Sequence, residues 1–367
     1  MKRRHFVGAV GAGSVAAMAG CAPQETHCEG TAENTSAETI KWNMVTTWPK
    51  NFQGLGEGAE HIAQLINQMS GGRLHVKVFG AGEIVPFQGV FDAVGSGVAQ
   101  MGHGAAYYWR GKMPSAPFFS TIPYGLNANE LTSWILRGGG YELWRELYEP
   151  FGIVPFLGGN TGVQMAGWFN KEINSLDDLK GLRMRIPGLG GEVLKRAGGI
   201  PILKGGGEVF TALETGNIDA AEFAGPYNDL AMGLYKAAKY YYYPGWHEPG
   251  PALETIVNKE AYNALPDDLK AIVENACNAA NQDIYSNYIA KNNSSLKVLV
   301  EDHNVELRRL PDDVLAELRV LADEVVAESV ADDPLGQRIL ASFMDFREQV
   351  RDWHAISEYA YTDIINK

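Results

Sequence analysis

A repeated helix-and-strand segment is the feature that most limits the fold of this chain. Residues 90–97 read VFDAVGSG and residues 209–216 read VFTALETG, so the two segments share apolar positions and a final glycine. That glycine is typical of a left-handed residue that closes a helix, and a short strand is predicted after each copy, at 98–102 and 218–222. Chance similarity is the alternative over so short a stretch. A duplication predicts two related α/β lobes that form a clamp.

The segments before the first copy alternate between strand and helix patterns. Residues 40–45 and 74–79 alternate apolar and polar side chains, as half-buried strands do, and residues 58–70 carry apolar side chains at helical spacing from Ile62 to Met69. A strand-helix-strand order favours a parallel pair of strands with the helix on one face. The pattern therefore predicts mostly parallel sheets covered by helices.

Helix-start signals dominate the last part of the chain. Proline followed by two acids occurs at 266–268 and at 311–313, and both residue types favour the first turn of a helix. One helix is predicted to run from Asp267 through Val300, which is longer than a compact lobe needs. We interpret residues 259–367 as a C-terminal helical region, whose long helix is either a flank of the lobes or an arm for dimerisation.

The N-terminal residues have the pattern of an export signal. Arg3 and Arg4 precede an apolar, glycine-rich run, and a charged start, a short apolar stretch and small residues at a cleavage site are typical of secreted proteins. The adjacent arginines indicate the twin-arginine route. Residues 17–19 fit an ordinary cleavage site, whereas residues 18–21 resemble a box in which Cys21 receives a lipid. Residues 1–21 are thus a predicted signal peptide, and residues 22–38 a flexible tether.

Charge and cysteine content exclude several classes of protein. The net charge is −13, so the chain lacks the basic surface that nucleic-acid binding requires. The three cysteines, at 21, 28 and 277, show no CxxC spacing, which argues against a zinc site and against a disulfide scaffold. Any anionic ligand must therefore be held by a local positive group.

Motifs of catalysis and of nucleotide binding are missing or lie in the wrong context. Neither G-x-S-x-G nor HExxH occurs, and no two histidines lie three or four residues apart. Residues 54–59 match G-x-G-x-x-A, but residues 49–53 separate them from the strand, whereas a dinucleotide-binding fold turns at the first glycine. We interpret His247, between two other polar or aromatic residues, as a packed or surface group. The sequence predicts neither an enzyme nor a nucleotide cofactor.

Isolated polar side chains inside apolar segments indicate a ligand site. They are Asn160, Gln164, Arg185, Glu222 and Glu248. An arginine holds a carboxylate through two parallel N–H groups. Two buried acids repel each other and an anionic ligand unless a cation lies between them. Their oxygens, an amide oxygen and a main-chain carbonyl suit a hard cation such as Na⁺ or Ca²⁺, and a 2-oxo or 2-hydroxy acid could complete its coordination. Taken singly, each residue also fits a solvated or ion-paired surface position.

Together these segments resemble the periplasmic solute-binding proteins of tripartite ATP-independent periplasmic (TRAP) transporters over nearly the whole chain after the tether. The family resemblance lies in residues 179–188 (LKGLRMRIPG). The branch that binds α-keto acids is indicated jointly by 159–164, 213–222, 225–229 and 244–248.

The resemblance implies roles for individual residues. Arg185 binds the ligand carboxylate, and Gln164 contacts both the ligand and the metal ion. Asn160 and Tyr107 are the other two substrate-binding residues. A sodium ion, or alternatively calcium, is held by Gln164, Glu222, the carbonyl of Phe223 and Glu248. Relatives carry tryptophan where this chain has Phe223, which leaves the size of the ligand open.

The implied fold class is α/β, of the two-lobe periplasmic-binding-protein type, with mostly parallel sheets, an interlobe cleft and long C-terminal helices. Residues 39–159 are expected mainly in lobe I and residues 160–258 mainly in lobe II, with crossover strands. The expected function is capture of pyruvate or a longer α-keto acid with a metal ion in the periplasm, delivery to the TRAP membrane permease, and dimerisation through the C-terminal helix. A 2-hydroxy acid such as lactate with calcium is the alternative. Less favoured are an exported enzyme acting on such acids and a sensor partner.

Overall fold

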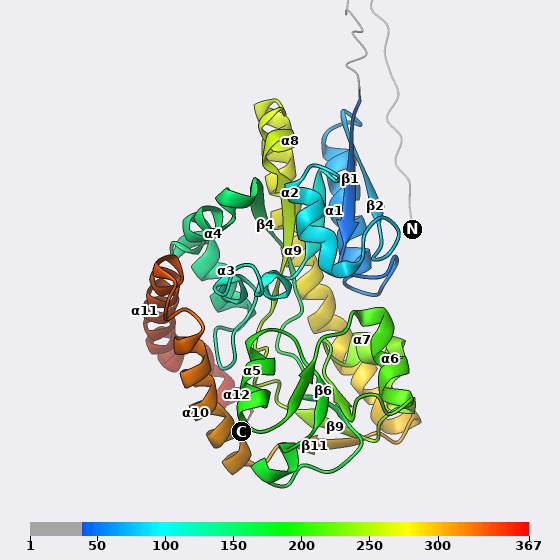
Figure 1. Cartoon of the computed structure of the whole chain (residues 1–367), viewed down its shortest axis with the longest axis vertical. Coiled ribbons are helices and arrows are strands. Elements are labelled where there is room, and N and C mark those ends of the chain that lie inside the picture. Colours follow the sequence, from blue (N-terminus) through cyan, green and yellow to red (C-terminus); the bar gives the residue numbers. More distant parts are fainter. Residues whose placement is uncertain (1–38, 367) are drawn as a thin grey trace, which may run out of the picture. The chain divides into compact units, whose positions relative to one another are not determined.

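Two mixed β-sheets organise the protein. The computed structural model describes residues 39–366, so the predicted signal peptide, the tether and Cys21 lie outside the described residues. Within that range, a five-stranded sheet has the order β2-β1-β3-β10-β4, and a six-stranded sheet has the order β11-β9-β5-β8-β6-β7 (Figure 1). We call the part built on the first sheet lobe I and the part built on the second sheet lobe II.

The strands of lobe I are β1 (Ile40–Thr46), β2 (Leu74–Phe79), β3 (Met101–Gly104), β4 (Ile153–Asn160) and β10 (Ala252–Asn258). Those of lobe II are β5 (Gly167–Phe169), β6 (Arg183–Arg185), β7 (Ile200–Ile202), β8 (Ala220–Ala221), β9 (Tyr240–Tyr243) and β11 (Glu306–Arg309). The helices are α1 (Gly56–Met69), α2 (Val90–Gly95), α3 (Ala128–Arg137), α4 (Gly140–Tyr148), α5 (Gly188–Arg196), α6 (Gly206–Glu214), α7 (Pro226–Met232), α8 (Lys259–Asn263), α9 (Asp267–Lys297), α10 (Asp312–Glu328), α11 (Pro334–Ile356) and α12 (Glu358–Ile365).

The predicted α/β class with two lobes is confirmed. Among the described strands, five pairings are parallel and four are antiparallel. Every antiparallel pairing involves β5 or β10. Each of these two strands is the first one after the chain passes from one sheet to the other. Each runs antiparallel to both of its neighbours in the new sheet.

The repeated segment forms the same unit in both lobes. The first copy forms α2 and leads to β3, and the second forms α6 and leads to β8. Gly97 and Gly216 adopt φ of 78° and 71°, the left-handed conformation expected after a helix. The strands are displaced from prediction, because β3 begins four residues after Gly97, at Met101, and β8 is only Ala220–Ala221. Local periodicity locates such short strands poorly, since sheet pairing decides their ends.

The C-terminal region is less purely helical than predicted. Helices α9 and α10 begin at Asp267 and Asp312, as the proline and acid pattern indicates, and α9 continues into a π-helical turn at Val298–Asp302. The chain then adds β11 in parallel to β9 at the edge of lobe II. Its charged sequence, Glu-Leu-Arg-Arg, suits an edge strand because charged side chains discourage further pairing.

Helix α9 packs against both lobes. It packs against α1 and β4 of lobe I and against α7 of lobe II, and Figure 1 shows it running from one lobe to the other. Buried residues on α9 include Val273, Cys277, Ile284 and Tyr288. This packing fits the interpretation of the helix as a flank of the lobes, and its interpretation as an arm for dimerisation stays a prediction.

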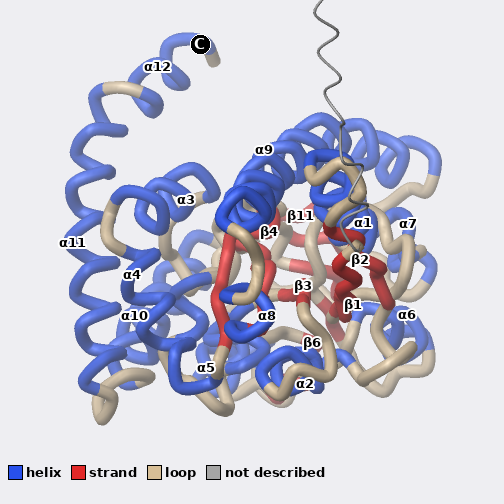
Figure 2. Tube along the Cα trace, turned by 90° about the horizontal axis from the view of Figure 1, so that it is seen from above, coloured by secondary structure: helices blue, strands red, loops and turns tan. Residues whose placement is uncertain are grey.

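Helices α10 and α11 lie to one side of the sheets, and α12 continues from α11 toward the C-terminus (Figure 2). Helix α10 packs against α5, and α11 packs against α3 and α4. Within residues 39–366, no helix combines the length and the apolar character that crossing a membrane requires.

Candidate functional site

Two connections between the sheets carry polar residues singled out from the sequence. Residues 161–166 lead from β4 to β5 and include Gln164, and residues 244–251 lead from β9 to β10 and include Glu248. The main chain joins the two connections, because the amide of Gln164 donates to the carbonyl of Glu248 at 3.1 Å and the amide of Gly245 donates to the carbonyl of Gln164 at 3.0 Å. Residues far apart in sequence are thus fixed at the junction of the lobes.

Arg185 is the buried cation of this region. It ends β6, and Nη1 donates to the Glu222 carbonyl at 3.0 Å and to the carboxylate oxygen Oε1 of the same residue. Nε donates to the carbonyl of Lys204 at 3.2 Å. Burial by itself lowers the pKa of Arg185, but the charge of Glu222 and of further neighbours outweighs burial and raises it. The guanidinium therefore stays charged, although only 2% of the residue is exposed.

Glu222 follows β8 and faces two partners. Its amide donates to the Arg185 carbonyl at 3.1 Å, because β6 and β8 are parallel neighbours. Its second carboxylate oxygen, Oε2, lies 3.3 Å from Nε2 of His247. Glu222, His247 and Glu248 are all buried, and each offers one donor atom within 4.8 Å of the other two. Such a group of donors is the geometry that a metal ion needs.

Unpaired oxygens at this cluster fit a cation. Oε1 of Gln164, Oε2 of Glu222 and Oε2 of Glu248 are buried and accept no hydrogen bond. Buried polar atoms without partners cost free energy, so each such atom needs an explanation. Burial and the nearby charge of Glu222 raise the pKa of Glu248 well above its usual range, and Arg185 only partly opposes them. A cation bound to these oxygens removes both penalties.

A small cavity lies beside the cluster. Its walls come from both lobes and from the two connections at 161–166 and 244–251, which we call the crossover segments. The lining includes Trp48, Leu55, Tyr107, Tyr108, Thr161, Gln164, Arg185, Phe223 and Leu253. Its volume is about 10 Å³, which is room for about one water molecule. A ligand of several heavy atoms is therefore admitted only if the lobes or these side chains move.

Tyrosine hydroxyls and aromatic rings shape this cavity. Burial, with the nearby negative charges, raises the pKa of Tyr107 and Tyr108, so both hydroxyls stay protonated and can donate to an anion. The Phe223 ring lies 5.1 Å from the guanidinium of Arg185 and 5.6 Å, edge to face, from Phe52. Gly206 lies so close behind the ring that a Cβ there would come within 2.9 Å of it.

Of the four predicted substrate-binding residues, Asn160 is the one outside the lining of this cavity. It ends β4, and its side chain donates to the Gly250 carbonyl at 3.0 Å and accepts from the Gly162 amide at 2.8 Å. Both partners belong to the crossover segments. Its contacts therefore hold the two segments together next to the site.

Sequence reasoning missed residues that the fold supplies. Tyr108 lies 3.5 Å from Nη2 of Arg185 through its hydroxyl, and Trp48 lines the cavity while its indole donates to His103 at 2.9 Å. His247 is buried, as expected of a packed group, and it also belongs to the cluster of possible metal ligands, which the sequence did not indicate. The position of His247 next to Glu248 was the one available signal for it.

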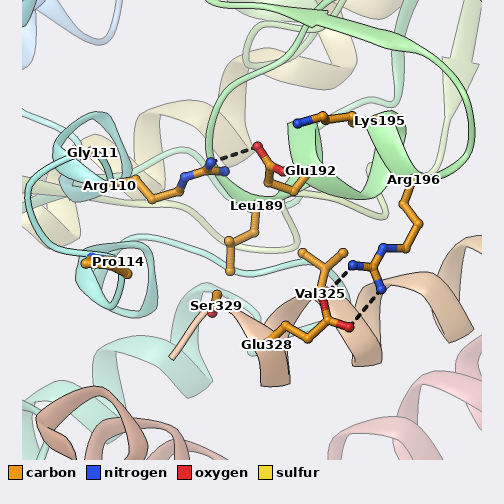
Figure 3. Close-up of a pocket in the computed structure, with 10 residues that line it drawn as sticks. All are labelled: Arg110, Gly111, Pro114, Leu189, Glu192, Lys195, Arg196, Val325, Glu328 and Ser329. Carbon is orange, nitrogen blue, oxygen red and sulfur yellow. Dashed lines mark hydrogen bonds and ion pairs between the residues drawn. The ribbon is translucent and has the colours of Figure 1, made fainter. Parts of the chain in front are cut away.

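A larger cavity of about 560 Å³ shares no lining residue with this cluster or with the smaller cavity. Figure 3 shows Arg110 reaching toward Glu192, and Arg196 paired with Glu328. Arg110 follows the short 3-10 helix η2 (Ala106–Trp109) of lobe I, whereas Glu192 lies on α5 of lobe II. The smaller cavity is the candidate ligand site, because the buried unpaired oxygens lie beside it, whereas Arg110, Glu192, Arg196 and Glu328 of the larger cavity are already ion-paired.

Known protein families account for this arrangement. The sequence matches the model of the DctP family, bacterial extracellular solute-binding proteins of family 7, over residues 44–333. The chain belongs to this family. It is a solute-binding protein of a TRAP transporter, a family of periplasmic binding subunits rather than of enzymes.

Individual relatives agree with this assignment. A monocarboxylate 2-oxoacid-binding periplasmic protein of Nostoc is 38% identical over 98% of each chain. A TRAP solute-binding protein of Colwellia psychrerythraea, solved with calcium and pyruvate, is 44% identical with a TM-score of 0.86, covering 89% of this chain and 99% of its own. A Pseudoalteromonas atlantica protein, solved with sodium and pyruvate, gives the same four values. A dimeric Bordetella bronchiseptica protein, with calcium and picolinate, is 35% identical with a TM-score of 0.87, over 89% and 97%.

Proposed function

We propose that this protein captures a short 2-oxo acid, with pyruvate as the leading candidate, together with a bound Na⁺ or Ca²⁺, and delivers it to the membrane permease of its TRAP transporter. The observation that carries the proposal is the buried group of oxygens without partners on Gln164, Glu222 and Glu248, next to the buried cation of Arg185. A metal ion bridged to a carboxylate ligand satisfies all of them at once.

The balance of charge supports a cation in this site. Two carboxylates and one guanidinium leave one negative charge in excess, and an anionic ligand adds a second. Burying this charge without compensation costs several kcal/mol. A sodium ion removes one of the two charges and a calcium ion removes both, and oxygen donors suit both ions.

Separate groups take the two ends of the ligand in this proposal. Nη1 of Arg185 is engaged by Glu222, whereas Nη2 makes only a long contact of 3.5 Å with the Tyr108 hydroxyl and is available to a carboxylate. Tyr107 and Tyr108 offer protonated hydroxyls. Gln164, Glu222, the Phe223 carbonyl and Glu248 would hold the cation, which would supply positive charge to the 2-oxo oxygen of the ligand. Asn160 supports the site by holding the crossover segments.

The ligand class follows the relatives named above, two of which hold pyruvate with calcium or with sodium. The aromatic and aliphatic walls of the cavity, such as Trp48, Leu55 and Leu253, suit a short apolar tail. A 2-hydroxy acid such as lactate offers a hydroxyl in place of the keto oxygen, and it is the alternative ligand, with calcium as its cation.

The test is calorimetric titration of the purified protein with pyruvate, longer 2-oxo acids and lactate, each with Na⁺, with Ca²⁺ and after chelation. We expect pyruvate to bind, its affinity to fall at least 10-fold when the cation is removed, and Arg185→Ala to lower affinity 100-fold or more, which corresponds to about 3 kcal/mol for a charge-assisted pair. Arg183→Ala is the matched control, because Arg183 lies on the same strand but pairs with Asp219 at the surface.

Each outcome of this test decides between functions. Unchanged binding in Arg185→Ala, or unchanged affinity after chelation of both ions, contradicts the proposed mechanism. Preference for lactate with calcium supports the alternative ligand. Turnover of the bound acid would indicate an exported enzyme, and we expect none. A separate experiment distinguishes a transport subunit from a sensor: deletion of the gene abolishes uptake of the 2-oxo acid only if the protein is a transport subunit.

Export by the twin-arginine route and lipid attachment at Cys21 belong to the same proposal. Both depend on residues 1–38, which lie outside the described part of the chain. Replacing Arg3 and Arg4 by lysine is expected to leave the precursor in the cytoplasm, and labelling with palmitate distinguishes a lipidated Cys21 from a cleaved leader.

The proposal includes a homodimer formed through the C-terminal helices. Exposed apolar side chains gather on α11 and α12, at Trp353, Ile356, Tyr359, Tyr361, Ile364 and Ile365. Clustered exposed apolar residues are typical of interaction surfaces. The Bordetella bronchiseptica relative is a dimer.

A further inference from the structure

His247 has no role in the function described so far, yet it lies inside the buried cluster. We propose that Nε2 of His247 is a direct ligand of the bound cation, and that the site consequently accepts first-row divalent cations such as Mn²⁺ in addition to Na⁺ or Ca²⁺. This inference rests on the proposed function, because it concerns the same cation and the same 2-oxo acid.

The geometry around the imidazole fits a ligand better than a hydrogen-bonding residue. Nε2 lies 3.3 Å from Oε2 of Glu222, but the two atoms do not form a hydrogen bond, and both ring nitrogens lack a hydrogen-bond partner. Two ligands at about 2.1 Å from one ion and at right angles lie about 3.0 Å apart. The observed separation is therefore close to that of neighbouring ligands on one metal.

The position of the ring is fixed by its surroundings. The side chain is fully buried, and the Trp246 ring packs against it edge to face at 5.4 Å. Gly190 of α5 lies so close that a Cβ there would come within 2.9 Å of the His247 Cβ. A buried imidazole without partners costs free energy, and a metal ion supplies the missing interaction.

The donor set indicates which cations fit. Glu222, Glu248 and the Gln164 amide offer oxygens, and His247 offers nitrogen. Imidazole suits first-row transition metals, whereas carboxylates suit Mg²⁺, Ca²⁺ and Mn²⁺, so Mn²⁺ accepts both kinds of donor. Together with the Phe223 carbonyl, these four side-chain donors would fill five positions of an octahedron, which leaves the sixth for the keto oxygen of a 2-oxo acid.

Electron spin-echo spectroscopy of bound Mn²⁺ tests this inference directly. The protein, stripped of metal and loaded with Mn²⁺ and pyruvate, is expected to show coupling to a ¹⁴N nucleus, and incorporation of ¹⁵N-labelled histidine is expected to convert this signal to that of ¹⁵N. His247→Gln is expected to lose the coupling, whereas His354→Gln is expected to keep it, since His354 pairs with Glu130 near the C-terminus.

Calorimetry with each metal provides the second readout. We expect His247→Gln to lower Mn²⁺ affinity at least 10-fold and Ca²⁺ affinity less than 3-fold, because calcium prefers oxygen and glutamine can replace the nitrogen by its amide oxygen. Absence of histidine coupling in the labelled parent protein, which needs no variant, overturns the inference. Equal losses of Mn²⁺ and Ca²⁺ affinity also overturn it and make His247 a residue that positions Glu222. Failure of the folded parent to bind pyruvate with any cation contradicts the proposed function instead.

Discussion

Arg185 and the two glutamates show how single residues acquire unusual properties in this fold. Each has an unremarkable local sequence, and each is buried within a few ångströms of the others. Burial raises the energy of every isolated charge, so opposite charges and a cation become necessary partners. The same physical effect acts on buried carboxylates outside the site, where it predicts a pH-dependent stability.

Glu254 on β10 is the clearest such residue. One carboxylate oxygen accepts from the Tyr148 hydroxyl at 2.8 Å and the other from the Trp109 indole. Burial raises the pKa of Glu254 to about 7, and the two hydrogen bonds oppose this only in part. The folded protein therefore binds the proton more tightly than the unfolded chain does.

We expect Glu254 to make the protein less stable as the pH rises. Its contribution is fully present below the unfolded pKa of about 4.5 and is lost as the pH rises through about 7. Over this pH range the free energy of unfolding is expected to fall by about 3 kcal/mol. Guanidinium unfolding at pH 5 and pH 8 should show this difference in the parent protein and a much smaller one in Glu254→Gln. An equal pH dependence in both proteins, or its loss in the surface control Glu146→Gln, would contradict this assignment.

At the scale of elements, the segment after β3 and helix α5 meet across the two lobes. Arg110 donates to the Gly188 carbonyl at 3.2 Å and to Glu192 at 2.7 Å. Gly188 begins α5, which follows directly from the strand of Arg185. The pair therefore links the element that carries Tyr107 and Tyr108 to the element that follows Arg185.

Loss of this link is expected to speed ligand release. Both side chains are about one-third exposed, and ion pairs of this kind contribute about 0.2–1 kcal/mol. Arg110→Gln should therefore raise the dissociation rate of pyruvate about 2- to 5-fold in stopped-flow measurements. Arg196→Gln is the matched control, because Arg196 lies in the same cavity but pairs with Glu324 and Glu328 of α10. Equal rates in the parent and in Arg110→Gln would show that this pair does not slow ligand release.

At the scale of the molecule, the exposed apolar residues of α11 and α12 predict self-association. Ile356 and Ile364 are 75% and 71% exposed, and burying such side chains contributes about 1.5–3 kcal/mol each. Light scattering should show a dimer for the parent and a monomer for the double variant Ile356→Glu and Ile364→Glu, with an unchanged circular dichroism spectrum. Ile289→Glu, which changes an exposed residue on α9, should remain dimeric. A monomeric parent protein would refute the proposal.

Several features of the fold were predictable from local sequence. The strand at 74–79 has the predicted bounds, the helices at 267 and 312 begin at the predicted residues, and the repeat forms equivalent elements in both lobes. These features depend on side-chain periodicity, on proline and acids in a first turn, and on glycine after a helix, all of which act over a few residues. The division into lobes at residues 159 and 258 stays a prediction, because the chain passes between the sheets within connections rather than at one residue.

By itself, the sequence determined the α/β character of the protein, its helix starts, its family and the residue types of its site. The tertiary structure alone decided which side chains meet. It brought Tyr108 and His247 to the site, left Asn160 outside the cavity lining, packed α9 against both lobes and paired Arg110 with Glu192 across them. The physical reason is the separation in sequence of the interacting residues. Turns and helices depend on interactions between near neighbours, whereas the site depends on strand pairing and lobe packing between residues tens of positions apart.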